Sequence, residues 1–259
     1  MGLFDKKYCD ICGEKIGLLG NRKLEDGNLC KNCAKKLSPW FSDRRKSTVQ
    51  EIKEQLDWRE ANRERAARFR TTRAYGERTK LLLDETHGWF AVTRAESPAE
   101  DNADVLDFSA ITGCRMDIDE RRTELKLETK DREGKTVHKS YSPPRYEYDY
   151  DFNMTICVNV PYFSEMKFRI NGSPLHVPYR PVTTVRSPAG FFAAPHGEPL
   201  YDAYYCRYKE TCQEICALLD TVRTGAEPAG PSVTRNWICP YCGAENHGKF
   251  CESCGAARP

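Results

Sequence analysis

Cys9-Asp10-Ile11-Cys12 and Cys30-Lys31-Asn32-Cys33 are two Cys-x-x-Cys pairs at the separation of a zinc finger. A two-residue spacer turns both thiolates of a pair toward one point, so two such pairs can close a tetrahedron around zinc with sulfurs at about 2.3 Å. Four protein ligands leave no open coordination position, and the spacing therefore predicts a structural zinc ion rather than a catalytic one. The alternative is a pair of redox-active thiol motifs, which we do not favour because two such motifs rarely lie this close together.

The residues around these cysteines predict a small folded module over residues 1–43. Gly13 follows the first pair, where a residue free to adopt positive φ lets backbone N–H groups turn toward the sulfurs. Residues 15–29 contain three glycines and have the composition of a short hairpin, and a helix is expected to begin at residues 34–37. Knuckle, hairpin and helix in this order predict a treble-clef module.

The same stretch resembles a bacterial zinc-finger family found at protein N-termini and known only as a domain of unknown function, DUF4428. The resemblance rests on Cys-Asp-Ile-Cys-Gly-Glu-Lys-Ile-Gly-Leu-Leu-Gly from Cys9 and on Lys-Leu-Glu-Asp-Gly-Asn-Leu-Cys-Lys-Asn-Cys-Ala-Lys-Lys-Leu-Ser from Lys23. It implies a bacterial protein and a zinc ion, and it implies no activity.

Residues 44–78 are expected to form a charged connecting helix. Thr48-Val49-Gln50-Glu51 has the spacing of a capping box, and Val49, Ile52 and Leu56 form an apolar stripe at helical spacing. Further along the stripe arginines replace the apolar residues, which predicts that the second half of the helix bridges two modules through solvent.

An arm that grips phosphates is the alternative use of the arginines in this helix. The arginines concerned are Arg59, Arg63, Arg65, Arg68, Arg70 and Arg73. We favour a solvated helix face, because Glu60 and Glu64 interleave acidic charge with them.

Residues 79–222 change to the period-two pattern of an antiparallel β-sheet that ends in one packing helix, which places the chain in the α+β class. The expected strands are residues 80–83, 89–93, 105–108, 111–118, 123–129, 137–141, 146–160 and 166–170. The even-numbered residues from Tyr146 to Val160 share one face and are mostly aromatic or aliphatic, which predicts a strand half-buried over its length. In the closing helix, Cys212 and Cys216 have apolar neighbours and are expected to be core thiols rather than metal ligands.

Seven or so strands followed by one helix resemble the pleckstrin-homology-like (PH-like) fold, and Phe108-Ser109-Ala110-Ile111-Thr112-Gly113 contributes to the likeness. Where phosphoinositide-binding members of that fold carry basic residues in the first loop between strands, this chain is expected to present the acidic residues 84–88. We therefore favour a protein-binding or structural use of this domain. The Pro-rich residues 171–200 are expected to fold back over the sheet with an edge strand at 182–186, and a binding loop containing Phe191 and Phe192 is the alternative.

The C-terminal part of the chain predicts a second zinc module. Residues 223–236 contain glycine and proline without apolar periodicity and are expected to form a flexible linker. Residues 237–259 resemble a short zinc ribbon in which Cys239, Cys242, Cys251 and Cys254 are the expected ligands. So short a segment cannot build a core, so zinc binding must supply its folding free energy, about 10–16 kcal/mol in comparable peptides.

Composition constrains the cellular setting. Eight of the 13 cysteines fall in Cys-x-x-Cys pairs and the remaining five are an odd number, which favours metal binding in a reducing cytoplasm over a disulfide framework. We expect no signal peptide and no membrane-spanning segment. Forty Lys and Arg residues against 38 Asp and Glu residues give a formal charge of +2, so no global field selects nucleic acid or an anionic membrane.

The function expected from these features is that of a non-enzymatic adaptor, stabilised by two structural Zn²⁺ ions, that binds protein partners. A nucleic-acid-binding protein is the alternative, and a membrane-associated PH-like protein is a weaker one. No Gly-rich phosphate loop, His-Glu-x-x-His or Gly-x-Ser-x-Gly motif is present, which favours a protein without enzymatic activity. His176 and His196 share the Pro-rich segment, where exposed histidines are more common than metal ligands.

Overall fold

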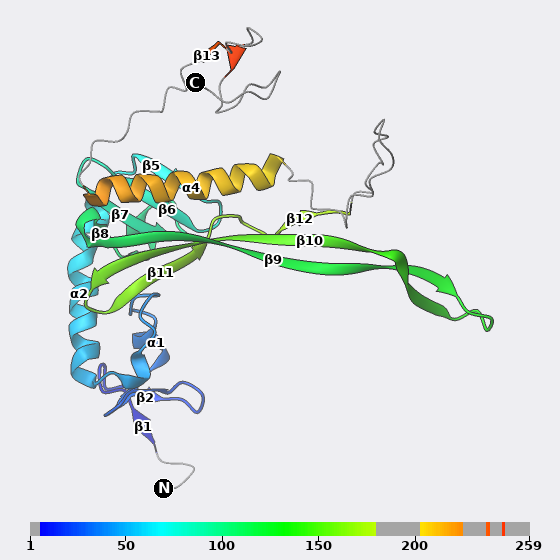
Figure 1. Ribbon diagram of the computed structural model, residues 1–259. Helices are drawn as coiled ribbons and strands as arrows, with labels where there is room; N and C mark the ends of the chain where they lie inside the picture. Colours follow the sequence, from blue (N-terminus) through cyan, green and yellow to red (C-terminus); the bar gives the residue numbers. More distant parts are fainter. Residues whose placement is uncertain (1–5, 180–202, 225–236, 239–244, 247–259) are drawn as a thin grey trace. The chain divides into compact units, whose positions relative to one another are not determined.

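The computed structural model describes residues 6–179, 203–224, 237–238 and 245–246, and the chain divides into two compact units. The first unit is Met1–Arg223 and the second is Thr224–Pro259 (Figure 1). In the second unit, β13 (Trp237–Ile238) pairs antiparallel with β14 (Glu245–Asn246). All other described elements belong to the first unit.

The N-terminal cysteine module consists of two short hairpins and a helix. Strand β1 (Lys7–Tyr8) pairs with β2 (Lys15–Ile16), and β3 (Arg22–Lys23) pairs with β4 (Asn28–Leu29). Helix α1 (Lys31–Ala34) begins directly after Cys30, three residues earlier than the sequence pattern indicated, because the Cys30 side chain caps its first turn. A 3₁₀ turn, η1 (Arg44–Lys46), leads out of the module.

Helix α2 (Val49–Arg68) begins as predicted. The side chain of Thr48 accepts a hydrogen bond from the backbone of Glu51, and the Glu51 carboxylate accepts one from the backbone of Thr48. Ile52 is fully buried in the core of the cysteine module, with Val49 and Leu56 beside it. The capping box and the apolar stripe are both confirmed.

The second half of α2 is buried along one side, so the prediction that it bridges two modules through solvent was wrong, although Glu60 and Arg63 on its other side are exposed. Arg59, Asn62 and Ala66 are all buried. Asn62 Nδ2 donates to the carbonyl of Ala103 at 2.6 Å, and its Oδ1 accepts from the backbone N–H of Val105 at 2.9 Å. This interface combines hydrogen bonds and an ion pair with a small apolar cluster of Ala66, Ala91, Ala103 and Val105, and its polar contacts leave no apolar pattern in the sequence.

The first sheet is an antiparallel meander in the order β5-β6-β7-β8. Its strands are β5 (Arg73–Tyr75), β6 (Lys80–Asp84), β7 (Trp89–Thr93) and β8 (Leu106–Asp107), with α3 (Pro98–Asp101) before β8 and η2 (Phe108–Ala110) after it. Strand β5 was not predicted, because its side chains are exposed or half-buried and show no apolar alternation. The first loop between strands is therefore residues 76–79 and not residues 84–88. Asp84 itself points inward and is fully buried.

The second sheet is built on two long strands, β9 (Ile111–Lys130) and β10 (Thr136–Val160), which pair antiparallel along their lengths. On the other edge of β10 lie β11 (Phe163–Arg169) and the unpredicted β12 (Leu175–Val177). The sequence predicted two strands in place of each long one. In β9, the charged residues 119–122 between the two expected strands do not end the pairing, because they lie in a ribbon that is largely exposed to water. In β10, the gap contains Pro143 and Pro144, and there the strand continues with a shift in register between Ser140 and Arg145.

The main core lies between the two sheets and α4 (Ala203–Thr224). On β10 the even-numbered residues from Tyr150 to Val158 are buried, which confirms the predicted face. From α4, Cys212, Ile215 and Leu219 are fully buried, and the Tyr205 ring packs edge-on against Phe152. The predicted strand at 182–186 lies outside the described residues. Within the described chain, no helix combines the length and apolarity needed to span a bilayer.

Candidate metal centre

Cys9, Cys12, Cys30 and Cys33 come together as the spacing predicted. Their four Sγ atoms all lie within 4.8 Å of one another, and the Sγ atoms of Cys12 and Cys30 are 3.8 Å apart. Sulfurs at about 2.3 Å from a tetrahedral zinc ion are about 3.8 Å from each other. The four thiols therefore fit the coordination shell of a zinc ion.

Local backbone structure holds the thiols in this arrangement. Cys9 and Cys12 sit in the turn between β1 and β2, which Gly13 closes with φ +74° and a hydrogen bond from its N–H to the Cys9 carbonyl at 2.8 Å. The backbone N–H of Cys30 donates to Cys9 Sγ, and that of Cys33 donates to Cys30 Sγ, both at 3.3 Å. These N–H groups stabilise negative charge on sulfur, which a metal-binding thiolate requires.

The thiols differ in acidity because their surroundings differ. Burial acts to raise the pKa of Cys9, but backbone N–H donors from Cys12, Cys30 and Ile11 outweigh it and bring the pKa down to about 7. Burial, followed by the neighbouring thiols, raises the pKa of Cys33 well above its ordinary value. Four thiolates in so small a volume repel one another strongly, and a divalent cation is the partner that offsets this repulsion.

Three of the four cysteines are buried: Cys9, Cys30 and Cys33 are 2%, 7% and 4% exposed. They belong to a small core with Ile16, Leu24, Leu29, Leu37 and Ile52. A metal held here is closed in by protein on most sides and has four protein ligands, as structural zinc sites do. In the part of the chain that the structure describes, no other group of three or more His, Cys, Asp or Glu side chains converges in this way.

The metal centre is tied to the start of α2 through the β3–β4 turn. Asp10 Oδ2 accepts from the backbone N–H of Asn28 at 2.6 Å, and Asp26 Oδ1 accepts from the N–H of Val49 at 2.8 Å. Gly27 lies so close to both partners that an added Cβ would be 2.5 Å from Val49 Cγ2 and 2.8 Å from Asp10 Oδ2. Ordering of the cysteines therefore orders the N-terminus of α2 as well.

The helix continues this connection to the sheets through a buried ion pair. Arg59 Nη1 contacts Asp104 Oδ1, and the two side chains are 8% and 0% exposed. Asp104 Oδ2 also accepts from Ser38 Oγ at 2.6 Å, while Arg59 Nε donates to the carbonyl of Lys36 at 3.3 Å. Asp104 thus joins the cysteine module, α2 and the loop before β8.

The remaining predicted site residues are placed as follows. Cys239, Cys242, Cys251 and Cys254 lie outside the described residues, as does His196. Cys212 is a buried core thiol, as expected, whereas Cys216 is half-buried with its Sγ 3.2 Å from Cys114 Sγ. No sequence pattern indicates the Cys114–Cys216 contact, because it depends on how α4 packs on β9. His176 Nδ1 lies 3.1 Å from Asp149 Oδ1 at an exposed position.

The arginines of α2 and β5 are mostly engaged with acidic or aromatic side chains. Besides the Arg59–Asp104 pair, Arg63 contacts Glu60 at 3.0 Å and Arg65 contacts Asp107 at 3.0 Å. Arg73 contacts Glu85 at 3.1 Å, and the Arg68 guanidinium lies over the Trp89 ring at 5.9 Å. These contacts weaken the alternative of a phosphate-gripping arm, because the arginines already neutralise protein charge.

Residues 7–55 match the family described as Domain of unknown function (DUF4428). The match covers the cysteine module and the first turns of α2, and it supplies no biological role. Searches of the curated proteins and of the solved structures found no match.

Proposed function

We propose that this protein is a non-enzymatic interaction protein stabilised by zinc, whose binding surface is the ribbon of β9 and β10 beyond the packed sheet. We call residues 121–147 the ribbon arm. Within it, β9 and β10 pair only with each other among the described strands, since β11 and β12 pair with β10 from residue 148 onward. Figure 1 shows the ribbon running on past β11. This exposed ribbon is the single observation that carries the proposal.

A two-stranded ribbon is marginally stable in water, and its outer backbone edges offer unpaired N–H and C=O groups. Such an edge suits addition of a partner strand, which gains main-chain hydrogen bonds along its length. Leu125, Leu127 and Val137 lie on one face of the arm, since Leu125 is opposite Arg145 and Leu127 opposite Lys139. Leu127 is 45% exposed, so this face offers apolar area to a partner.

The net charge of the ribbon arm indicates what kind of partner it binds. The ribbon arm contains eight Lys and Arg residues against five Asp and Glu residues, a formal charge of +3, whereas the whole chain carries +2. Complementary charge speeds association and excludes like-charged competitors. We therefore expect an extended, acidic protein segment that contributes a strand to the arm.

The test is to shorten the arm without disturbing the sheet. Arg122 and Tyr148 are directly opposite, so residues 123–147 can be replaced by an Asn-Gly turn that joins them. A second variant, K126E/K139E, keeps the ribbon and reverses two charges. Partners recovered from native lysate by the full chain should be lost with the shortened arm and reduced with K126E/K139E. Recovery unchanged in both variants would refute the proposal.

Nucleic-acid binding is the second candidate, and the ribbon arm favours it over the arginines of α2. A two-stranded ribbon fits the major groove of DNA, and phosphate contacts by Lys and Arg are strongest at low salt. Fluorescence anisotropy with mixed-sequence duplex DNA and RNA at low salt would separate the candidates. Tight binding that the shortened arm abolishes would favour nucleic acid, and no binding would eliminate it.

Several finer assignments are also proposals. The closed four-sulfur geometry supports zinc as the metal, and the two hairpins with α1 support a treble-clef arrangement. The order of a four-stranded sheet, a second sheet and α4 supports a PH-like fold. The two Cys-x-x-Cys pairs beyond residue 236 support a second zinc ribbon. The free thiols fit a reducing, cytoplasmic setting. Bacterial origin and a membrane role through the PH-like domain remain predictions.

A further inference from the structure

A cavity of about 670 Å³ lies where the cysteine module meets the two sheets. Its volume falls within the roughly 300–1,000 Å³ of small-molecule sites. The segment after α1 supplies Pro39 and Trp40, and the sheets and the loops beside them supply the rest. These other lining residues are Arg78, Thr79, Val92, Arg94, Asp101, Asn153, Lys167, Phe168, Arg169 and Asn171.

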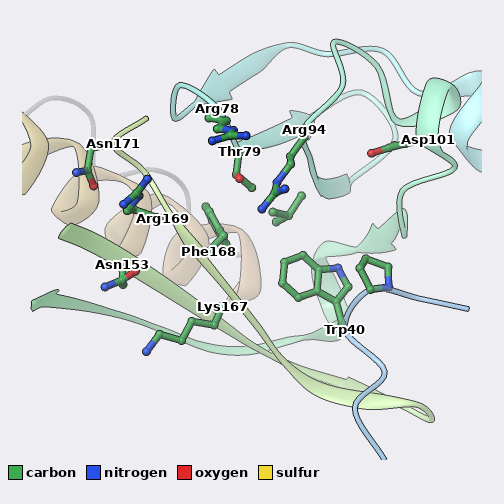
Figure 2. A pocket seen from close by; sticks show the side chains of 12 residues that line it. Trp40, Arg78, Thr79, Arg94, Asp101, Asn153, Lys167, Phe168, Arg169 and Asn171 are labelled. Atoms are coloured by element: carbon green, nitrogen blue, oxygen red, sulfur yellow. The ribbon is translucent and has the colours of Figure 1, made fainter. Parts of the chain in front are cut away.

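The lining is basic, and much of its positive charge is unbalanced. Arg169 is neutralised by Asp151 at 2.6 Å, and the one acidic lining residue, Asp101, accepts from Thr93 Oγ1 at 2.6 Å. Arg78, Arg94 and Lys167 form no ion pair with any residue that the structure describes. Figure 2 shows Arg78 and Arg94 on one side of this space, with Phe168 and Arg169 on the other.

Trp40 provides a second, independent indication of a ligand. Its indole Nε1 is buried and has no hydrogen-bond acceptor among the described residues. The residue is held in place from its backbone, because the Trp40 N–H donates to Ser38 Oγ at 3.1 Å and Ser38 Oγ donates to Asp104. Buried N–H donors in native proteins are nearly always paired, so this one is suited to an acceptor that the protein does not itself supply.

We infer that this cavity binds a small phosphorylated organic molecule. The guanidinium forks of Arg78 and Arg94 match the geometry of a phosphate group, and two positive charges suit a dianion better than a single carboxylate. The Lys167 side chain extends away from these two arginines, so it is not counted among the phosphate-binding groups (Figure 2). Trp40 and Phe168 form an apolar wall for the organic part, and an oxygen or ring nitrogen of the ligand accepts from the indole N–H. The site depends on the cysteine module, which supplies Trp40.

Calorimetric titration of the full chain tests this inference with four probes. They are inorganic pyrophosphate, adenosine diphosphate, inositol trisphosphate, and phosphatidylcholine vesicles doped with phosphatidylinositol bisphosphate. We expect saturable binding of a soluble organic phosphate that is tighter than binding of pyrophosphate. Binding to the doped vesicles without binding to any soluble organic phosphate would overturn the assignment of a small-molecule site.

Matched variants locate the site. Arg78 and Arg94 are exposed at the cavity mouth, so R78Q/R94Q should fold normally and weaken binding at least about ten-fold, because hydrogen bonds to charged groups are strong. The control is R22Q/R45Q, which makes the same charge change at a separate basic cavity on the cysteine module that residues 21–25, Arg44 and Arg45 line. The control should bind within about two-fold of the wild type.

If R78Q/R94Q and R22Q/R45Q weaken binding of the organic phosphate equally, the attraction is non-specific and the inference is overturned. Loss of binding in R22Q/R45Q alone would overturn it as well. W40F removes the indole donor and keeps the aromatic wall. W40F should weaken binding of the organic phosphate and leave binding of pyrophosphate unchanged. An unaltered melting temperature of W40F checks that the variant folds. Undiminished binding of the organic phosphate by W40F would remove Trp40 from the site.

Discussion

Replacing Asp104 by alanine should destabilise the first unit far more than any exposed charge change. The Asp104 side chain is 0% exposed and Arg59 is 8% exposed, so D104A leaves a buried guanidinium and the Ser38 hydroxyl without their shared acceptor. Removing one partner of a buried ion pair costs about 3–5 kcal/mol. A whole domain is stable by only about 5–15 kcal/mol, so this single change should remove a large fraction of the free energy of unfolding.

The Arg59–Asp104 ion pair is expected to connect the cysteine module, α2 and the loop before β8 without adding much to the net free energy of unfolding. Burial raises the pKa of Asp104, and the favourable contacts with Arg59 and Ser38 only partly offset this rise. The attraction therefore roughly balances the cost of desolvation, and replacing both partners by apolar residues in R59M/D104L should cost much less than D104A alone. Together with the single variants R59M and D104L, the double variant gives the coupling free energy between the two side chains.

Urea unfolding followed by circular dichroism gives the free energies, with E60A as the control. Glu60 pairs with Arg63 at a site where the two side chains are 70% and 64% exposed, so its removal should cost less than about 1 kcal/mol. The unfolding midpoint of D104A should fall well below that of E60A. If D104A and E60A lose the same small free energy, Asp104 does not join the cysteine module and α2 to the sheets as described.

Three further changes test other contacts. Burial acts to raise the pKa of Asp84, but hydrogen-bond donors from Arg70 and His87 outweigh burial and lower that pKa. Asp84 therefore contributes stability at a pH above the ordinary aspartate pKa, and this contribution is lost as the pH falls through the pKa of the folded state. D84N should therefore destabilise most at neutral pH and least in acid, and a pH-independent loss in chemical denaturation would contradict this. Burial, and then the hydrogen bond to Glu77, raise the pKa of Tyr208 to about 12. E77Q should therefore lower the pKa of Tyr208 in an ultraviolet titration, in which Y208F identifies the signal of this tyrosine. An unchanged pKa would exclude the contact. G27A should destabilise the cysteine module by about 1–3 kcal/mol, because the added Cβ overpacks against Val49. The control G17A should not destabilise it, because a Cβ at Gly17 has no neighbouring atom within 4 Å. Equal melting temperatures of G27A and G17A would contradict the close approach of Gly27 to Val49.

Local features of this chain could be predicted from its sequence because short-range physics decides them. The Cys-x-x-Cys spacing fixes where two thiols point, and the capping box at Thr48 fixes where α2 begins. The buried face of β10 follows from strict alternation over Tyr150–Val158, since only one face can meet the core. In each case the signal lies within a few residues of the feature.

Features that depend on distant partners could not be predicted in this way. Arg59 and Asn62 look like solvent-facing residues in the helical pattern, yet Asp104 and the backbone around Ala103 bury them. The full length of β9 and β10 was also missed, because the charged residues 119–122 in β9 and the prolines Pro143 and Pro144 in β10 have the composition of a loop. The cavity beside Trp40 is lined by six stretches that are separate in the sequence, and no motif marks it.

Metal content with sulfur coordination tests the central claim most directly. Full-length protein freed of adventitious ions should contain two zinc ions per chain, and X-ray absorption should report four sulfur ligands at about 2.3 Å for each. The C30S/C33S variant should lose one ion and the order of its N-terminal module, while C251S/C254S should lose the other. Zinc content that C30S/C33S leaves unchanged, or a first shell with nitrogen or oxygen in place of sulfur, would contradict the account.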